Sequence, residues 1–193
     1  MATKRTSQWV RALASAVVGF GAGTVFGGGG FVRTYDWKTE WHIDAPLPDV
    51  YHAMTDLTVQ YRWWTGMIVK RVTPIPGSSE GHILEGEIHQ TGSPGRLAPP
   101  FQLVSRITAL EQDRRMRSIV SGALVGVMET FFYPREEGGT RVVFYWYVRV
   151  HNPLLNALGK VLEPSFRASH DRFMRDGEAG LQAYCQQRLL VKS

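Results

Sequence analysis

The sequence has little of several features that carry known chemistry. Its single cysteine, Cys185, excludes an intramolecular disulfide framework and a cysteine-rich zinc site. Its six histidines show no His-x-x-x-His or Glu-x-x-His spacing, so we expect no bound metal and no cofactor. The sequence has no Gly-Lys-Ser/Thr triplet, and Thr24 stands where a Gly-x-Gly-x-x-Gly loop starting at Gly19 would need glycine. A nucleotide-binding loop is therefore not expected.

Acidic residues are missing from the first 35 residues, whereas Lys4, Arg5 and Arg11 stand near the start. The formal net charge of the chain is +5, so the remainder is nearly neutral. A nucleic-acid-binding protein concentrates basic side chains on its folded domain, but here much of the excess lies on a short arm, residues 1–11. We therefore expect no nucleic-acid partner and a membrane-flanking role for the arm.

Charged residues are also absent from residues 12–32. As a helix this segment would be about 30 Å long, which matches the hydrocarbon core of a bilayer. Its small residues Ser15, Gly19, Gly23 and Gly27 are spaced four apart and would let another helix approach closely. This face predicts either self-association or a partner in a membrane complex.

Three interpretations of residues 12–32 remain open. The charge-free length favours a retained membrane anchor, and the basic start with a small-residue stretch is also typical of a cleaved signal peptide. Four consecutive glycines, 27–30, favour a flexible tail on a cytoplasmic protein. If the segment spans a membrane, the basic arm places the N-terminus in the cytoplasm and the domain outside.

Residues 35–190 are predicted to form one α+β domain. From Tyr35 to Ile43 apolar and polar residues alternate, which indicates a half-buried strand. A short helix is expected from Pro48 to about Leu57, followed by a second through residues 61–64. Six closely spaced and therefore antiparallel strands are then expected, at residues 67–75, 82–90, 101–111, 116–121, 124–133 and 140–150.

The C-terminal part is predicted to be helical. Pro164 is expected to separate a shorter helix from a long one at about residues 165–189. Phe166, His170 and Phe173 recur at steps of three and four residues, so one face of the long helix is apolar and aromatic.

Residues 35–187 resemble the START/Bet v 1-like (SRPBCC) superfamily, which includes polyketide cyclase-type and lipid-transfer proteins. The resemblance implies a helix-grip fold, in which a seven-stranded curved antiparallel sheet surrounds a long C-terminal helix and a hydrophobic cavity commonly lies between them. The matching stretches are Ile43-Asp44-Ala45-Pro46 with Val50-Tyr51, Asp56 with Tyr61-x-Trp63-Trp64, Gly81, Gly139-Thr140-Arg141-Val142 and the amphipathic last helix.

The chain is rich in aromatic residues, with 6 Trp, 7 Tyr and 9 Phe. These rings fit a packed core as well as a ligand-lined cavity, and a small-molecule pocket would be mostly apolar with few polar groups. The predicted cavity-lining residues are Trp41, Met128, Phe132, Phe144, Trp146, His170, Phe173 and Met174. Of Trp63 and Trp64, one is expected in the core and the other as a gate.

Few residues are candidates for acid–base chemistry. Arg106, Glu129 and His170 lie on elements that could face the cavity, but structural ion pairs are the favoured interpretation for the first two and a packed core position for His170. Cys185 is expected to be a small core residue.

These features support three hypotheses about function. The first is a membrane-tethered START-like module that binds a hydrophobic ligand such as a lipid, a polyketide or a pigment-like molecule. The second is an enzyme of the polyketide cyclase/aromatase kind, which would need acid–base groups inside the cavity. The third is an accessory subunit of a membrane protein complex, with the cavity filled.

Overall fold

A computed structural model of the chain describes residues 33–74, 82–88, 101–151 and 153–192. The chain divides into two units, residues 1–30 and 31–193, and every described residue belongs to the second. The predicted anchor at 12–32, with its face of Ser15, Gly19, Gly23 and Gly27, lies outside the described residues. Within those that are described, no helix combines the length and the apolar character needed to cross a membrane.

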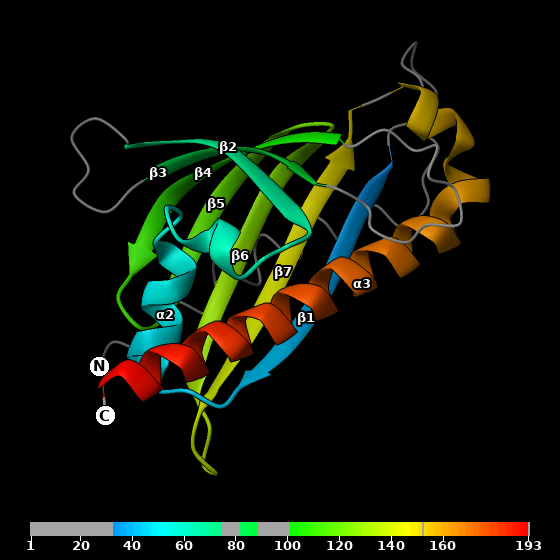
Figure 1. The fold of residues 1–193 in the computed structure, drawn as a ribbon. Helices are drawn as coiled ribbons and strands as arrows, with labels where there is room; N and C mark the ends of the chain where they lie inside the picture. Colours follow the sequence, from blue (N-terminus) through cyan, green and yellow to red (C-terminus); the bar gives the residue numbers. More distant parts are fainter. Residues whose placement is uncertain (1–32, 75–81, 89–100, 152, 193) are drawn as a thin grey trace, which may run out of the picture. The chain divides into compact units, whose positions relative to one another are not determined.

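The strands form one seven-stranded sheet in the order β1-β7-β6-β5-β4-β3-β2 (Figure 1). Every neighbouring pair is antiparallel, and β1 lies beside β7 at one edge. The expected α+β class and antiparallel sheet are therefore confirmed. The strands are β1 (Thr34–Ile43), β2 (Met67–Pro74), β3 (His82–Ile88), β4 (Phe101–Glu111), β5 (Arg115–Gly122), β6 (Leu124–Pro134) and β7 (Thr140–Val150).

One face of the sheet carries the helices. These are α2 (Leu47–Thr55), the short 3₁₀ helix η1 (Gln60–Arg62) and the long α3 (Pro153–Lys192). Figure 1 shows α3 running across β1 and β7, with α2 and η1 on the same side of the sheet. The second helix expected at residues 61–64 is thus only one 3₁₀ turn.

The prediction that Pro164 separates two helices is wrong, because α3 continues through Pro164 as one helix. A proline inside a helix removes one backbone hydrogen bond and leaves a carbonyl unpaired within the helix. Pro164 lies on an exposed face of α3, where water solvates such a carbonyl. The expected long C-terminal helix is confirmed, and it begins about twelve residues earlier than predicted.

Two side chains of α3 hold the helix against the edge of the sheet. The backbone N–H of His42 donates to Glu178 Oε1 at 2.7 Å, and that of Asp44 donates to Gln182 Oε1 at 2.8 Å. Glu178 and Gln182 stand one helical turn apart, so one meets His42 of β1 and the other meets Asp44, just beyond the end of that strand. These bonds satisfy edge groups that a terminal strand otherwise leaves exposed, and they fix which part of α3 crosses β1.

The alternation of β1 determines which residues face α3. Tyr35, Trp41 and Ile43 are buried, whereas Asp36 and Lys38 are exposed. The register places Trp37 opposite Trp146 of β7, and Trp146 opposite Met128 of β6, so these three share the inner face. The inner face is therefore lined by large side chains from at least three adjacent strands.

Candidate ligand-binding site

The inner face of the sheet has two distinct regions. The first, here called the tryptophan cluster, consists of Trp41, Trp63, Trp64, Phe144 and Phe173. The Trp41 ring lies 4.5 Å from Phe144 and 5.3 Å from Trp64, centroid to centroid. Trp64 stacks on Trp63 at 5.3 Å and on Phe173 at 4.7 Å. These contacts fill the space between η1, β1, β7 and the middle of α3.

Two glycines of α3 allow the helix to pack closely against the tryptophan cluster. A Cβ atom added at Gly177 would lie 2.7 Å from the Trp64 ring and 2.8 Å from the Trp41 ring. A Cβ added at Gly180 would lie 1.8 Å from the carbonyl oxygen of Trp63, which is backbone and cannot turn aside. The helix can approach η1 this closely only because both positions lack a side chain.

The indole N–H groups of Trp63 and Trp64, the two residues that follow η1, both donate hydrogen bonds to backbone carbonyls. Trp63 Nε1–H donates to the Ala53 carbonyl at 3.3 Å, and Trp64 Nε1–H donates to the Phe173 carbonyl at 3.1 Å. The two tryptophans are only 2% and 4% exposed. Neither ring therefore has the exposure that the predicted gate would need, and both pack as core residues.

The second region, here called the His170 region, consists of Tyr35, Trp37, Trp146, Phe166 and His170. The His170 ring lies 4.3 Å from Trp37 and meets Trp146 edge-on at 6.0 Å. Tyr35 lies 4.6 Å from Trp37 and 6.4 Å from Phe166. Residues of two strands and one helix thus converge where β1, β7 and α3 meet.

This region contains buried polar atoms without partners. Within the described part of the chain, three buried atoms of this region form no hydrogen bond: Tyr35 Oη, Trp146 Nε1 and His170 Nε2. Thr130 Oγ1 is also unpaired, but Thr130 lies opposite Phe144 of the tryptophan cluster. Trp41 Nε1 is a similar atom in the tryptophan cluster. A buried polar group left unpaired costs about 1–3 kcal/mol, so native proteins almost always pair such groups with protein, water or ligand.

The central strand beside this region is incompletely covered. Met128 and Leu124 of β6 are only partly buried, although β6 has neighbours on both sides. Thr130 and Phe132, further along the same face, are 0% and 3% exposed. The inner face is therefore sealed near α2 and more open beside Trp146.

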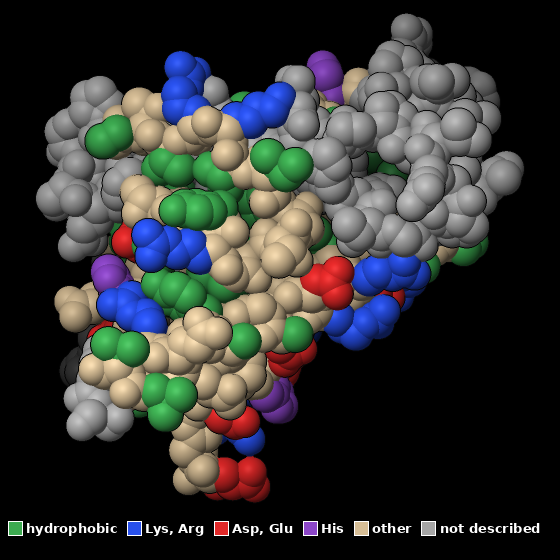
Figure 2. Space-filling view, in the orientation of Figure 1, with side chains coloured by type: hydrophobic (Ala, Val, Ile, Leu, Met, Phe, Trp, Pro, Cys, Tyr) green, Lys and Arg blue, Asp and Glu red, His purple; other side chains and the backbone are tan. Residues whose placement is uncertain are grey.

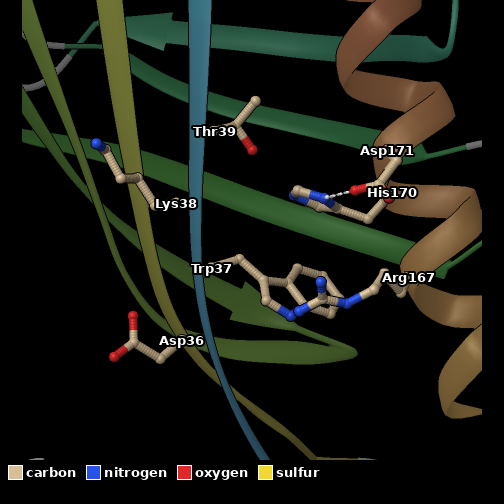
Figure 3. Close-up of a pocket in the computed structure, with 7 residues that line it drawn as sticks. All are labelled: Asp36, Trp37, Lys38, Thr39, Arg167, His170 and Asp171. Carbon is tan, nitrogen blue, oxygen red and sulfur yellow. Dashed lines mark ion pairs between the residues drawn. The ribbon is translucent and has the colours of Figure 1, made fainter.

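A narrow cleft of about 90 Å³ reaches the His170 region between β1 and α3 (Figure 3). Figure 3 shows Trp37 and Thr39 on the helix side of β1, whereas Asp36 and Lys38 point to the other side. The cleft is lined by Asp36, Trp37, Lys38, Thr39, Arg167, His170 and Asp171.

The electrostatics of His170 follow from its burial. Burial lowers the pKa of the imidazole below its ordinary value, and the adjacent Asp171 carboxylate opposes that shift. His170 Nδ1 lies 3.6 Å from Asp171 Oδ1, and the side chain is 13% exposed. A carboxylate beside Nδ1 favours the neutral form that keeps its proton there. Nε2, the buried atom without a partner, is then a hydrogen-bond acceptor.

A larger groove of about 490 Å³ lies elsewhere, between α2 and the β4–β5 turn. Its lining is mixed and includes His52, Asp56 and Asp113. Asp56 Oδ1 already accepts bonds from the backbone N–H and the hydroxyl of Thr58. No atom of the groove lining is among the buried unpaired polar atoms of the described residues, so the His170 region is the stronger candidate.

The structure distributes the eight predicted cavity residues between the two regions. Trp41, Phe144 and Phe173 belong to the tryptophan cluster, and Met174 and Phe132 are buried core residues. Trp146 and His170 belong to the His170 region, with Met128 beside them.

Sequence reasoning missed Tyr35, Trp37 and Phe166 as candidate site residues. The alternation of β1 did contain the signal for two of them, because Tyr35 and Trp37 share a strand face with Trp41.

The other candidates for acid–base chemistry lie away from this region. Arg106 is exposed, and Glu129 pairs with Arg117 at 3.7 Å. Cys185 is 2% exposed, and burial raises the pKa of its thiol to about 11, which suits an unreactive core residue. Of Arg106, Glu129 and His170, only His170 faces the interior.

Comparison with known proteins identifies relatives by fold. No protein-family model and no curated protein matches the chain. Among solved structures, the Zhui aromatase/cyclase from Streptomyces sp. R1128 is 11% identical, with a TM-score of 0.52 over 82% of this chain and 96% of that one. A protein from Thermus thermophilus is 17% identical, with a TM-score of 0.56 over 78% of this chain and 99% of the other. A Staphylococcus aureus protein of unknown function is 15% identical, with a TM-score of 0.53 over 80% and 98%. At these identities the similarity shows a shared fold.

Proposed function

We propose that the protein binds a small, largely apolar molecule between the sheet and α3, in the His170 region. The observation that carries this proposal is the set of buried polar atoms without partners in this region: Tyr35 Oη, Trp146 Nε1 and His170 Nε2. A binding site for a small molecule is typically an apolar surface with a few polar groups that orient the ligand. The aromatic walls and these three atoms fit that description.

Two further observations support binding here. The partial exposure of Met128 gives the inner face an incompletely covered area on a central strand. The resemblance to START/Bet v 1-like proteins, and the aromatase/cyclase among the proteins of similar fold, fit a helix-grip arrangement with a ligand between sheet and helix.

A cyclase-type enzyme is the alternative, and the described residues favour it less. Such a reaction needs groups that can give and take protons beside the bound chain. The region offers one group of suitable ordinary pKa, the His170 imidazole, and one phenol, Tyr35. A binding role requires only the hydrogen-bonding capacity of these groups.

The binding proposal can be tested with the neutral fluorescent probe N-phenyl-1-naphthylamine. We expect the full-length protein to bind it with enhanced, blue-shifted fluorescence, and Met128→Trp, which narrows the region, to weaken binding at least threefold. The matched control Ile119→Trp changes an exposed residue of β5 and should leave affinity unchanged. Equal affinity for both variants would overturn this location, and absence of binding to the wild type would overturn the function.

Membrane tethering remains a proposal that rests on the sequence of residues 12–32 alone. Fractionation of the full-length protein and of a variant lacking residues 1–32 tests it. We expect the full-length protein in the membrane fraction and the shortened one in the supernatant. If full-length protein with an intact N-terminus is entirely in the supernatant, the tether does not exist. Gly23→Leu then tests whether the small-residue face binds a partner helix, since the larger side chain should abolish co-purification.

A further inference from the structure

The unpaired atoms of His170 and Trp146 have opposite hydrogen-bonding capacities. An indole N–H can only donate, so Trp146 Nε1 requires an acceptor. The neutral His170 imidazole, with its proton on Nδ1 beside Asp171, presents a lone pair at Nε2 and requires a donor. Their rings meet at 90° with centroids 6.0 Å apart. A single hydroxyl group can satisfy both atoms, because its oxygen accepts while its hydrogen is donated.

The surroundings disfavour an ionised ligand. The side chains that surround these two atoms on the inner face are uncharged: Trp37 and, beyond it, Tyr35, with Met128 opposite Trp146. Burying an ion without an opposite charge or several hydrogen bonds is costly. The nearby charges of Asp171 and Arg167 stand on exposed side chains of α3, where water already solvates them. The ring of Trp37 lies 4.3 Å from His170 and also lines the cleft, so part of this flat side chain is accessible to a ligand.

We propose that the ligand is an uncharged molecule with a hydroxyl group on a flat apolar skeleton, a phenol or a similar alcohol. Its hydroxyl donates to His170 Nε2 and accepts from Trp146 Nε1–H, while its skeleton lies against Trp37. The inference rests on the proposed binding function and adds the chemical class of the ligand.

Binding of such a ligand depends on pH through His170. Protonation replaces the acceptor at Nε2 with a donor and places a positive charge beside the ligand, so only the neutral imidazole binds. Affinity is then constant above the pKa of His170 in the free protein and falls up to tenfold per pH unit below it. The titratable and charged groups around His170 are Asp171 and Arg167 on α3, Asp36 and Lys38 of β1, and the Tyr35 phenol.

The test uses three matched probes: 2-naphthol, its methyl ether 2-methoxynaphthalene, and naphthalene. They share a skeleton and differ in whether they can donate a hydrogen bond. For the full-length wild type at about pH 7.5 we expect 2-naphthol to bind about tenfold more tightly than either of the others, as one well-placed hydrogen bond would give. Only 2-naphthol should lose affinity as the pH falls.

Variants assign the effect to the two side chains. His170→Phe and Trp146→Phe should each bring the affinity for 2-naphthol close to that for naphthalene. His170→Gln retains an acceptor but does not titrate, so it should keep much of the preference and lose the pH dependence. His52→Gln, which changes an exposed histidine of α2, is the matched control and should behave as the wild type does.

The outcomes separate the two proposals. If all three probes bind the wild type equally, the protein binds apolar molecules and the hydroxyl inference is wrong. If 2-naphthol is preferred but His170→Phe and Trp146→Phe keep the full preference, the assigned atoms are wrong and the inference fails. If no probe binds at its solubility limit, both the function and the inference fail.

Discussion

The tryptophan cluster and the His170 region are both built from aromatic side chains, but the first is a packed core and the second is a candidate binding site. In the cluster, Gly177 and Gly180 let α3 approach η1, and the N–H groups of Trp63 and Trp64 bond to backbone carbonyls. In the His170 region, the N–H of Trp146 and the Nε2 atom of His170 are buried without such partners. Aromatic content alone therefore does not mark a binding site. What separates the regions is how closely α3 packs: Gly177 and Gly180 let it close over the cluster, although Trp41 Nε1 is unpaired there, whereas a cleft reaches His170.

Figure 2 shows the outer side of this arrangement. On the face viewed in Figure 1, hydrophobic side chains are spread over α2, η1 and β2, basic and acidic ones lie side by side along the middle of α3, and acidic ones stand at the tip of the β6–β7 hairpin. Trp63 and Trp64, which follow η1, are buried and contribute almost nothing to this surface. The difference between the two regions thus lies inside the molecule.

The largest effect is expected from breaking the cluster. Trp64→Ala removes a ring that stacks on Trp63 and Phe173 and leaves the Phe173 carbonyl without its donor. We expect a loss of about 3–5 kcal/mol in the free energy of unfolding, measured in urea. Tyr61→Ala, at a side chain that is half exposed, should cost much less. Equal losses would show that Trp64 is not part of a packed core.

A smaller loss in the free energy of unfolding is expected when a single methyl group is added to α3. Gly180→Ala places a Cβ atom against the Trp63 carbonyl and should lower the free energy of unfolding by about 1–3 kcal/mol through overpacking. Ala183→Ser, at an exposed position of the same helix, is the control and should change it by less than about 0.5 kcal/mol. A Gly180→Ala protein as stable as the wild type would contradict the close approach of α3 to η1.

The same substitution at two threonines compares a buried hydroxyl group that is hydrogen-bonded with one that is not. Thr130 and Thr140 are both fully buried, but Thr140 Oγ1 donates to the Ala45 carbonyl at 2.8 Å while Thr130 Oγ1 is unpaired. Thr140→Val should cost about 1–2 kcal/mol, and Thr130→Val should leave the ligand-free protein about 1 kcal/mol more stable. Urea unfolding measures both. A comparable loss at both positions would contradict the unpaired state of Thr130.

The smallest expected effect is the contribution of His170 to the pH dependence of the free energy of unfolding. Because burial lowers its pKa in the folded state, the unfolded chain takes up a proton more readily. The contribution is therefore fully present above the ordinary histidine pKa of about 6.5 and declines as the pH falls from there through the lowered folded pKa. The difference in unfolding free energy between wild type and His170→Gln should shrink over that range. A difference independent of pH would show that His170 titrates normally.

The sheet could be predicted from the sequence because each strand is encoded by a pattern within its own residues. Tyr35 to Ile43 and Thr140 to Val150 alternate along the chain, and that pattern requires strands with one buried face. The predicted helix break at Pro164 is wrong, because Pro164 is exposed and α3 continues through it.

The division of the interior could not be predicted in the same way. The indoles of Trp64 and Trp146 look alike in the sequence, and only folding brings the Phe173 carbonyl to one of them. The role of Gly177 likewise depends on rings contributed by distant segments. These contacts join η1, β1 and α3, so no spacing within one segment encodes them.

The most direct test compares the indole N–H groups by NMR. The chain has six tryptophans, and Trp→Phe variants assign their N–H resonances. During titration of the full-length protein with 2-naphthol, we expect the Trp146 N–H resonance to move downfield, as a newly formed hydrogen bond requires. The resonances of Trp63 and Trp64, which are already bonded, should stay in place. A Trp146 resonance that stays fixed, or Trp64 and Trp146 resonances that move together, would contradict the division into a packed cluster and a ligand-binding region.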